Sequence, residues 1–134
     1  MAVFEVYGGH SLKGEIVPQG AKNEALQILC AVLLTPEKVR ICNVPEIVDV
    51  LQRIELLGKL GVEVERLGQG EYMFRVADID LEYMKIEDYR KRASRPRGSV
   101  MIIGPLMASF GEGYMPKPGV QKIGRRRPGT HFLA

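Results

Sequence analysis

Basic residues stand at the start of two apolar segments of the chain. Lys22-Asn23 opens the apolar segment 22–34, and Arg97-Gly98-Ser99 opens the apolar segment 97–110. If each segment is a helix, its first N–H groups are unpaired and its positive dipole end lies beside a cation, which makes a compact anion site. The arginine adds a planar donor suited to bidentate phosphate contacts. The alternative for Lys22 is a side chain that only reaches solvent from the helix end.

The densest basic run is Lys122-Ile123-Gly124-Arg125-Arg126-Arg127-Pro128-Gly129. Its basic residues lie in residues 85–127, which hold 11 Lys and Arg against 3 Asp and Glu, whereas residues 1–84 hold 8 against 13. Such clustering favours an anionic partner, namely a phosphate, nucleotide, nucleic acid or acidic membrane, over a solvated surface. Because only Tyr114 and Phe132 are aromatic among the last 24 residues, the stacking platform of RNA-binding proteins is missing. A small basic nucleic-acid-binding module therefore stays an alternative.

Other chemistries lack their sequence signals. His10 and His131 are far apart, no cluster has the spacing of a metal site, and Walker, GxGxxG and GxSxG motifs are missing, so we expect no metal and no cofactor. Cys30 and Cys42 lie among apolar residues without CxxC spacing, which predicts core thiols. Since the sequence has no export signal and no apolar run of about 20 residues, we expect a cytoplasmic protein without a membrane partner.

Alternation and turn residues predict the first elements that position these cations. Residues 4–7 and 12–17 alternate as two short strands, and a turn at 18–20 leads into a helix over 22–34. This helix is apolar on nearly every side, so we expect it to be buried rather than amphipathic. Thr35-Pro36 ends it, because a residue before proline avoids helical dihedrals.

A strand, a second helix and a hairpin follow. The strand runs over 39–44, and Pro45 then suits the first position of a helix. The helix ends at Gly61, which takes the usual C′ position. Residues 62–65 and 72–76 form the two strands of the hairpin. One face of the helix is apolar and consists of Ile47, Val50, Leu51, Ile54, Leu57 and Leu60.

The rest of the chain predicts less regular structure. Residues 83–92 suit a short surface helix, and Pro105 predicts a kink within 97–110. Residues 111–129 contain five Gly and three Pro, which predicts a long mobile loop. The layouts around Lys22 and Arg97, 75 positions apart, resemble each other. We therefore predict a mixed α/β fold with a repeated βαβ-type unit, each unit holding a buried helix.

Five short motifs carry a resemblance to a known family: Gly20-Ala21-Lys22-Asn23, Asn43-Val44-Pro45, Arg97-Gly98-Ser99, Gly104-Pro105-Leu106 and Ile123-Gly124-Arg125-Arg126. In order and spacing the chain resembles the N-terminal part of the UDP-N-acetylglucosamine 1-carboxyvinyltransferases, a family of enolpyruvyl transferases in peptidoglycan synthesis. The resemblance implies the inside-out α/β barrel of that family, with outward sheets and buried helices, incomplete here. Residues 1–20 would be strands of a second domain, and residues 21–134 the first two units of a truncated first domain. The related alternative is 5-enolpyruvylshikimate-3-phosphate synthase.

The resemblance also implies substrates and site residues. The family adds the 3′-hydroxyl of UDP-N-acetylglucosamine to phosphoenolpyruvate and then eliminates phosphate. By resemblance, Lys22 and Arg126 would hold phosphoenolpyruvate, and Asn23 and Arg97 would contact the sugar nucleotide and the phosphate region. The nucleotide would be lined by Arg126, Arg127, Pro128, Gly129 and Thr130.

Three positions depart from the family pattern. Gln121 stands where the family has a catalytic Cys or Asp, Val120 replaces a Gly, and Gly129 replaces an Asp. An amide cannot exchange a proton near neutral pH, whereas a thiol or carboxyl can. The family's general base would also lie outside this chain. We therefore expect the chain to be inactive without the remainder of the enzyme and to self-associate through exposed apolar faces.

Overall fold

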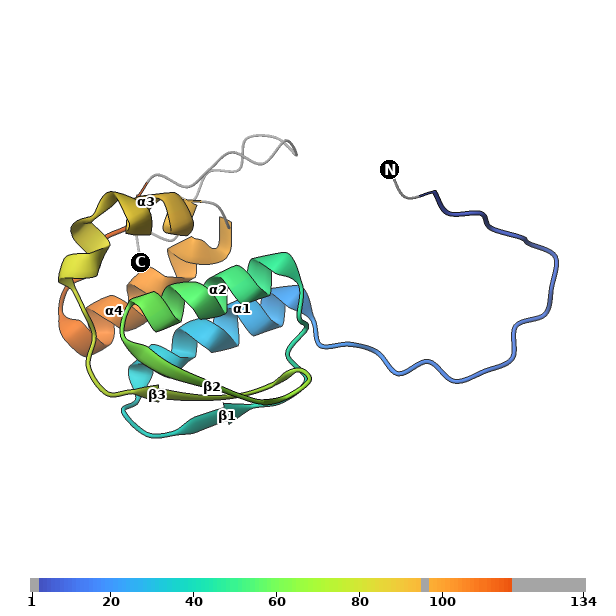
Figure 1. Cartoon of the computed structure of the whole chain (residues 1–134), viewed down its shortest axis with the longest axis horizontal. Helices are drawn as coiled ribbons and strands as arrows, with labels where there is room; N and C mark the ends of the chain where they lie inside the picture. The colour runs from blue at the N-terminus through green and yellow to red at the C-terminus, as the bar shows by residue number, and fades with distance from the viewer. Residues whose placement is uncertain (1–2, 95–96, 117–134) are drawn as a thin grey trace.

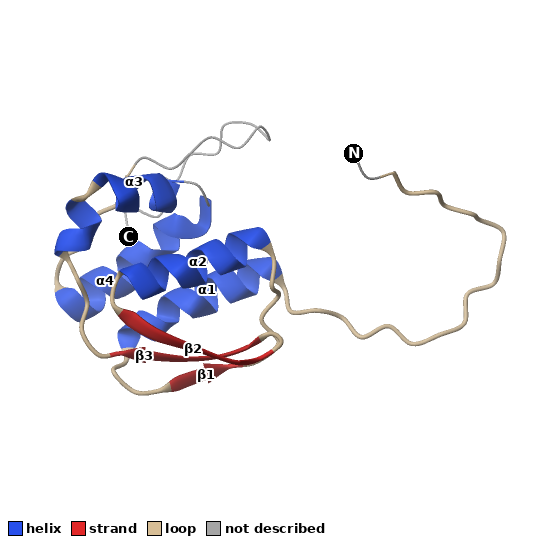
Figure 2. Ribbon diagram, viewed as in Figure 1, coloured by secondary structure: helices blue, strands red, loops and turns tan. Residues whose placement is uncertain are grey.

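The computed structural model describes residues 3–94 and 97–116. A three-stranded sheet has the order β1-β3-β2, with β1 at Val39–Ile41, β2 at Val62–Gly68 and β3 at Glu71–Val76. β3 pairs antiparallel with both neighbours, so β1 and β2 run in the same direction on either side of it. The helices gather on one side of this sheet (Figures 1 and 2). The predicted α/β class is confirmed.

The first helix ends close to where proline chemistry predicts. α1 spans Lys22–Ala31 and continues as the 3₁₀ helix η1 at Val32–Leu34, after which Thr35 is extended. The prediction that this helix is buried on nearly every side is wrong, because Ile28 is 45% exposed and Leu34 is 54% exposed. Helices cover one side of α1 and leave the other open. The buried side consists of Ala25, Leu26, Leu29, Cys30, Val32 and Leu33.

The second helix begins later than predicted. α2 spans Val48–Lys59 with the extended residue Ile47 as its N-cap, so Pro45 is not its first residue. The backbone N–H of Val44 donates to the carbonyl of Gly70 at 2.8 Å, which keeps this stretch against the β2–β3 turn instead of in a helix. The predicted stop is confirmed, because Gly61 has a φ of 104°, which a Cβ would strain.

The buried face of α2 differs in part from the predicted one. Ile47 is 37% exposed and Leu51 is 41% exposed, although both were expected to be buried. A charged residue, Arg53, is fully buried instead. The face that packs into the core consists of Val50, Arg53, Ile54, Leu56 and Leu57.

The two cysteines have different surroundings. Cys30 is buried in α1 as predicted, and burial raises the pKa of its thiol. Cys42 is exposed just after the edge strand β1, with its sulfur 3.8 Å from a carboxylate oxygen of Glu71, so its prediction as a core thiol is wrong. Being among apolar residues in sequence is not enough to bury a residue that follows a sheet edge.

The N-terminal segment, residues 3–20, forms neither of the two predicted strands. It runs away from the helices and the sheet (blue in Figure 1), and its apolar side chains are exposed, Leu12 to 99%. A strand needs a neighbouring strand for its backbone hydrogen bonds, and no strand of the described residues lies beside this segment. Its place in a second domain stays a prediction.

The last described elements are helical. The 3₁₀ helix η2 (Glu82–Lys85) and α3 (Glu87–Ser94) correspond to the predicted short helix, but α3 buries Tyr89 and Ala93 and is not only a surface helix. The 3₁₀ helix η3 (Arg97–Ile102) changes into α4 (Ile103–Phe110) shortly before Pro105. Pro105 therefore lies in the first turn of α4, where its missing N–H has no partner to lose.

The predicted mobile loop lies mostly outside the described residues, which end at residue 116 of 111–129. None of the helices in the described ranges is long and apolar enough to span a membrane. Within the same ranges, no group of three or more His, Cys, Asp and Glu residues could hold a metal ion.

Glu46 should make the stability of the fold depend on acid pH. Its carboxylate accepts hydrogen bonds from Arg66 Nε and Nη2 at 2.9 and 3.0 Å and from Tyr72 Oη at 2.8 Å, and these bonds lower its pKa from 4.5 to about 2. A lowered pKa in the folded state gives stability that is present above 4.5 and lost as the pH falls through about 2.

We therefore expect Glu46→Gln to lower the urea midpoint at neutral pH, with a difference from the unaltered chain that shrinks toward pH 2. Glu37→Gln is the matched control, because Glu37 is exposed and its carboxylate makes no hydrogen bond or ion pair with the described residues. A constant difference between Glu46→Gln and the unaltered chain over this pH range would contradict the assignment.

Candidate functional site

The starts of α1 and α2 lie side by side. Lys22 is the first residue of α1, and its ammonium forms an ion pair with the carboxylate of Asp49 in the first turn of α2. The two side chains are 43% and 36% exposed, so a ligand in solution can reach them. Asn23 is exposed beside Lys22. The residue before α1 is Ala21, which gives no side-chain cap to the first N–H groups.

The helices form one layer on the sheet, and the start of η3 lies at the same end of this layer as the start of α1. η3 packs against α1, and α4 packs against η1. Since α1 precedes η1 and η3 precedes α4, the two helical rods run in the same direction. The backbone of Arg97 therefore begins its helix at the end where Lys22 begins α1. Two positive helix ends together favour a polyanion.

The segments around Lys22 and Arg97 resemble each other in their helices but not in their strands. The described residues contain one complete βαβ arrangement, in which α2 joins β1 to β2 and β3 lies between them. No strand follows β3 within the described ranges. The second unit of the predicted repeat is therefore represented here only by η3 and α4.

Gly20 fixes where α1 begins. A Cβ at Gly20 would lie 2.0 Å from the carbonyl oxygen of Asn43, so only glycine fits there. Asn43 itself has a left-handed φ of 56° and leads into Val44 and Pro45. A hollow of about 130 Å³ lies between this turn and the first turns of α1. The Gly20 and Asn43-Val44-Pro45 motifs thus hold the helix start in place.

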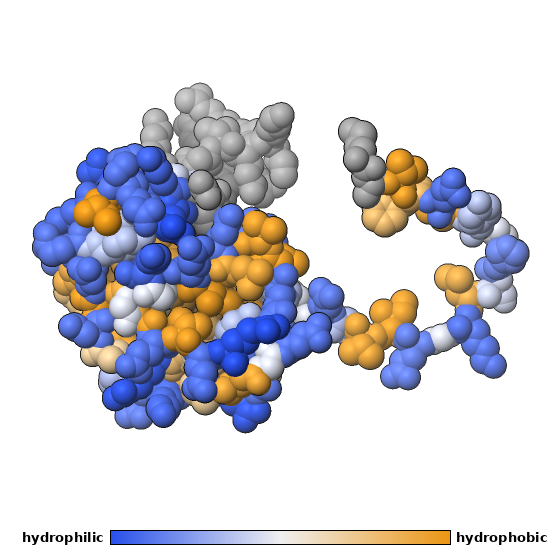
Figure 3. All heavy atoms as spheres, in the orientation of Figure 1, coloured by the Kyte–Doolittle hydropathy of each residue, from blue (hydrophilic) through white to orange (hydrophobic). Residues whose placement is uncertain are grey.

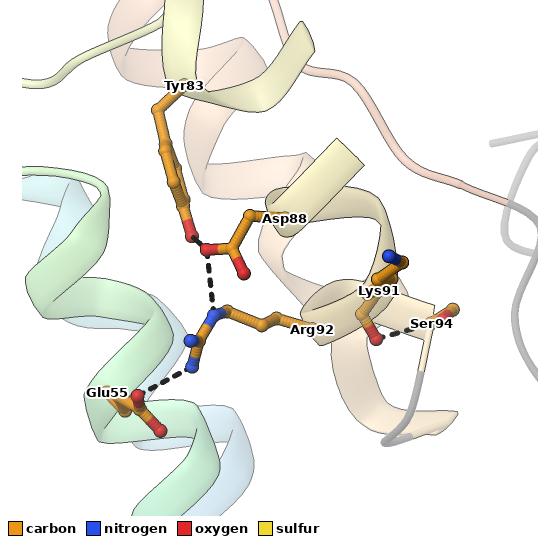
Figure 4. A network of polar contacts seen from close by, with 6 residues as sticks. All are labelled: Glu55, Tyr83, Asp88, Lys91, Arg92 and Ser94. Carbon is orange, nitrogen blue, oxygen red and sulfur yellow. Dashed lines mark hydrogen bonds and ion pairs between the residues drawn. The ribbon is translucent and has the colours of Figure 1, made fainter. Parts of the chain in front are cut away.

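A polar network ties α3 to α2 (Figure 4). Arg92 donates from Nη1 to Glu55 on α2 at 2.6 Å and from Nε to Asp88 at 2.9 Å, and Tyr83 donates to Asp88 at 2.6 Å. The bonds from Tyr83 and Arg92 lower the pKa of Asp88. Burial, with the Asp88 carboxylate second, raises the pKa of Tyr83 to about 12, so Tyr83 stays a donor.

Sequence reasoning missed three residues that matter here. Asp49 and Glu46 make hydrogen bonds and ion pairs with residues that are 20 to 27 positions away, and hydrophobic periodicity does not reveal such contacts. Arg53 carries a local signal, because it falls on the apolar face three residues after Val50. Burial lowers its pKa, while Cys30 and Tyr89 act in the opposite direction.

Six of the nine residues of the predicted site lie outside the described residues: Gln121, Arg126, Arg127, Pro128, Gly129 and Thr130. Of the other three, the structure gives Lys22 and Asn23 with their side chains and Arg97 with its backbone. It brings these three residues to one end of the helix layer.

Comparisons with known proteins agree on one family. Residues 6–133 match the family model described as EPSP synthase (3-phosphoshikimate 1-carboxyvinyltransferase). Three similar relatives are the UDP-N-acetylglucosamine 1-carboxyvinyltransferases of Bacteroides fragilis, Bacteroides thetaiotaomicron and Porphyromonas gingivalis, at 52%, 51% and 47% identity over 133 residues. Each comparison covers 99% of this chain, and the chain spans 31% of each relative's length.

Proposed function

Because the chain belongs to the EPSP synthase family, we propose that it is the N-terminal part of a UDP-N-acetylglucosamine 1-carboxyvinyltransferase. The proposal is supported by identities of 47–52% to three relatives of that name, over 99% of the chain. Since the chain spans 31% of those relatives, the remainder of such an enzyme would be its partner. The active protein would work in the cytoplasm, in peptidoglycan synthesis.

The proposed reaction joins two polyanions. The 3′-hydroxyl of UDP-N-acetylglucosamine adds to the central carbon of phosphoenolpyruvate, and the loss of phosphate then restores the enol double bond. The observation that carries this proposal is the pair of helix starts, at Lys22 and Arg97, at one end of the helix layer. Positive helix ends that are already oriented stabilise negative charge without reorganisation during the reaction.

The residues proposed to contact the substrates have the following roles in this scheme. Lys22 and Arg126 hold the phosphate and carboxylate of phosphoenolpyruvate, and Asp49 orients the ammonium of Lys22 through its ion pair. Asn23 and Arg97 contact the sugar nucleotide and the phosphate region. Residues 126–130 line the nucleotide.

Shikimate 3-phosphate is the alternative acceptor, which the description of the matching family model favours. Hydrogen exchange distinguishes the two acceptors. We expect UDP-N-acetylglucosamine to slow amide exchange at the starts of α1 and η3, and shikimate 3-phosphate to leave it unchanged. Protection by shikimate 3-phosphate alone would transfer the assignment to the shikimate enzyme, and protection by neither would contradict both.

The chain by itself should show no transferase turnover. It spans 31% of the length of its relatives, and Gln121 lacks a transferable proton. The assay is phosphate release from phosphoenolpyruvate in the presence of UDP-N-acetylglucosamine, with Lys22→Ala as the matched variant. Phosphate release that Lys22→Ala abolishes would show that the chain is active alone.

We also propose that the chain self-associates through apolar side chains on the first turns of α2. Val48 is 67% exposed next to the partly exposed Ile47 and Leu51. Apolar side chains gather on part of the surface in Figure 3. Burial of such side chains between two copies would remove apolar area from water. Concentration-dependent sedimentation that Val48→Glu weakens would support this part of the proposal.

A further inference from the structure

The β1–α2 loop, residues 42–47, lies between the turn of the β2–β3 hairpin and the residues that precede α1. On the α1 side, a Cβ at Gly20 would lie 2.0 Å from the carbonyl oxygen of Asn43. On the hairpin side, the N–H of Val44 donates to the carbonyl of Gly70 at 2.8 Å. In Figure 1 the hairpin turn and the starts of α1 and α2 lie on the same side of the molecule. The backbone of this loop is therefore held from two sides.

Glu46 anchors the β1–α2 loop to the hairpin through its side chain. Its Oε1 accepts hydrogen bonds from Arg66 Nε at 2.9 Å, Tyr72 Oη at 2.8 Å and the Gly70 N–H at 3.3 Å. Its Oε2 accepts a bond from Arg66 Nη2 at 3.0 Å. Two parallel bonds from one guanidinium fix the orientation of the carboxylate as well as its distance. Both oxygens are thus occupied by donors of the hairpin.

The loop anchored by Glu46 determines where Asp49 lies. The carbonyl of Ile47, the next residue, accepts the N–H groups of Val50 and Leu51 at 3.0 Å each. The first turn of α2 therefore begins directly after Glu46, and Asp49 lies within that turn, three residues further on. Because a hydrogen-bonded helical turn moves as a unit, a displacement of Glu46 would also displace the carboxylate of Asp49.

The same loop also determines where Lys22 lies. Gly20, which packs on the carbonyl of Asn43, is two residues before Lys22, and the ammonium of Lys22 forms its ion pair with Asp49. Both partners of this ion pair are therefore placed by the β1–α2 loop. An ammonium group has three donors, so the bond to Asp49 leaves two of them for an anion.

We propose that Glu46 is a positioning residue, which holds the β1–α2 loop on the hairpin and thereby keeps the Lys22–Asp49 pair in the geometry that binds phosphoenolpyruvate. This inference rests on the proposed function. Glu46 acts through Asp49 and not on the substrate, because its own carboxylate oxygens are bonded to the hairpin. An ammonium that is already oriented loses less freedom when an anion binds, so the effect of Glu46 should be visible in affinity.

The nitrogen chemical shift of Lys22 Nζ tests the positioning in the 134-residue chain without any ligand. It can be detected through the hydrogens on Cε, and Asp49→Asn gives the reference value for a lysine without its carboxylate partner. We expect Glu46→Gln to move the shift toward that reference. Glu63→Gln is the matched control, because it causes the same change of charge and breaks an ion pair with Arg75, but at the end of the hairpin opposite to its turn.

Titration with phosphoenolpyruvate tests the consequence for binding. We expect Glu46→Gln to raise Kd about 3- to 10-fold, as the loss of charge-assisted hydrogen bonds predicts. Removal of a negative charge by itself would lower the Kd of an anion, so a rise cannot come from net charge. Glu63→Gln should therefore show no rise. The double reversal Glu46→Arg with Arg66→Glu should recover part of the affinity that either single reversal loses.

Tyr72→Phe is a milder second variant, which removes one bond to Glu46 and keeps the aromatic ring; its effects should be smaller and in the same direction. An unchanged Lys22 Nζ shift in Glu46→Gln would overturn the positioning, and a changed shift with an unchanged Kd would overturn its role in anion binding. Equal losses in Glu46→Gln and Glu63→Gln would also contradict it. If the unaltered chain does not bind phosphoenolpyruvate, the proposed function fails, while the Nζ shift still decides whether Glu46 positions Lys22.

Discussion

Replacing Lys22 with alanine in a full-length enzyme that carries this chain should lower kcat/KM for phosphoenolpyruvate about 10²–10³-fold, the range for removing one preorganised donor from developing negative charge. Lys22 opens α1 without a side-chain cap before it, so in the proposed site its ammonium and the free helix N–H groups would act on the same anion. The variant should fold normally, because an ion pair this exposed stabilises a protein by about 0–1 kcal/mol.

The matched control for this variant is Lys38→Ala. Lys38 is equally a surface lysine, but it precedes β1, away from the start of α1. We expect Lys38→Ala to retain full kcat/KM, and Lys22→Arg to recover part of the activity because it keeps the charge but not the compact ammonium. Equal losses in Lys22→Ala and Lys38→Ala would indicate a general effect of surface charge and would contradict a specific anion site.

The elements that local chemistry determines were predicted well. Pro36 and Gly61 end their helices for reasons that lie within a few residues of each, namely the restricted dihedrals before proline and the left-handed φ of glycine. The hairpin at β2 and β3 follows from alternation around a glycine turn. In these cases residues that are close in sequence determine where the element ends or turns.

The elements that depend on distant partners could not be predicted. Residues 4–7 and 12–17 alternate like strands but have no strand beside them in the described residues. Pro45 suits a helix start, yet the hydrogen bonds of Val44 with Gly70 and of Glu46 with Arg66 hold this stretch outside the helix, which begins at Val48. Periodicity describes one segment at a time, whereas these outcomes depend on which segments meet.

The two helix starts of the candidate site could be predicted from the sequence, but the contacts around them could not. Lys22 and Arg97 were singled out because a cation at a positive helix end suits an anion, and the packing of η3 on α1 brings those ends together. The ion pair to Asp49 joins residues 27 positions apart, and the hydrogen bond between Arg92 and Glu55 joins residues 37 apart. No local pattern marks either pair, so both required the structure.

Replacing Gln121 with aspartate or cysteine should raise turnover of the full-length enzyme about 10²–10⁴-fold, the usual contribution of a general acid. Gln121 lies outside the described residues. The family that the chain resembles has Cys or Asp at this position. An amide can hydrogen-bond a substrate but cannot deliver a proton near neutral pH. The reaction needs a proton at the methylene carbon of phosphoenolpyruvate when the hydroxyl adds to the neighbouring carbon.

The decisive comparison uses the Gln121, Gln121→Cys and Gln121→Asp forms on one full-length background, with Gln121→Asn as a control that keeps the amide. We expect the asparagine form to be as slow as the glutamine form and both acidic forms to be faster. Only the cysteine form should react with an epoxide that alkylates thiolates in this loop, because a carboxamide has no nucleophilic sulfur. Equal turnover in all four forms would show that this position transfers no proton and that another group of the enzyme supplies it.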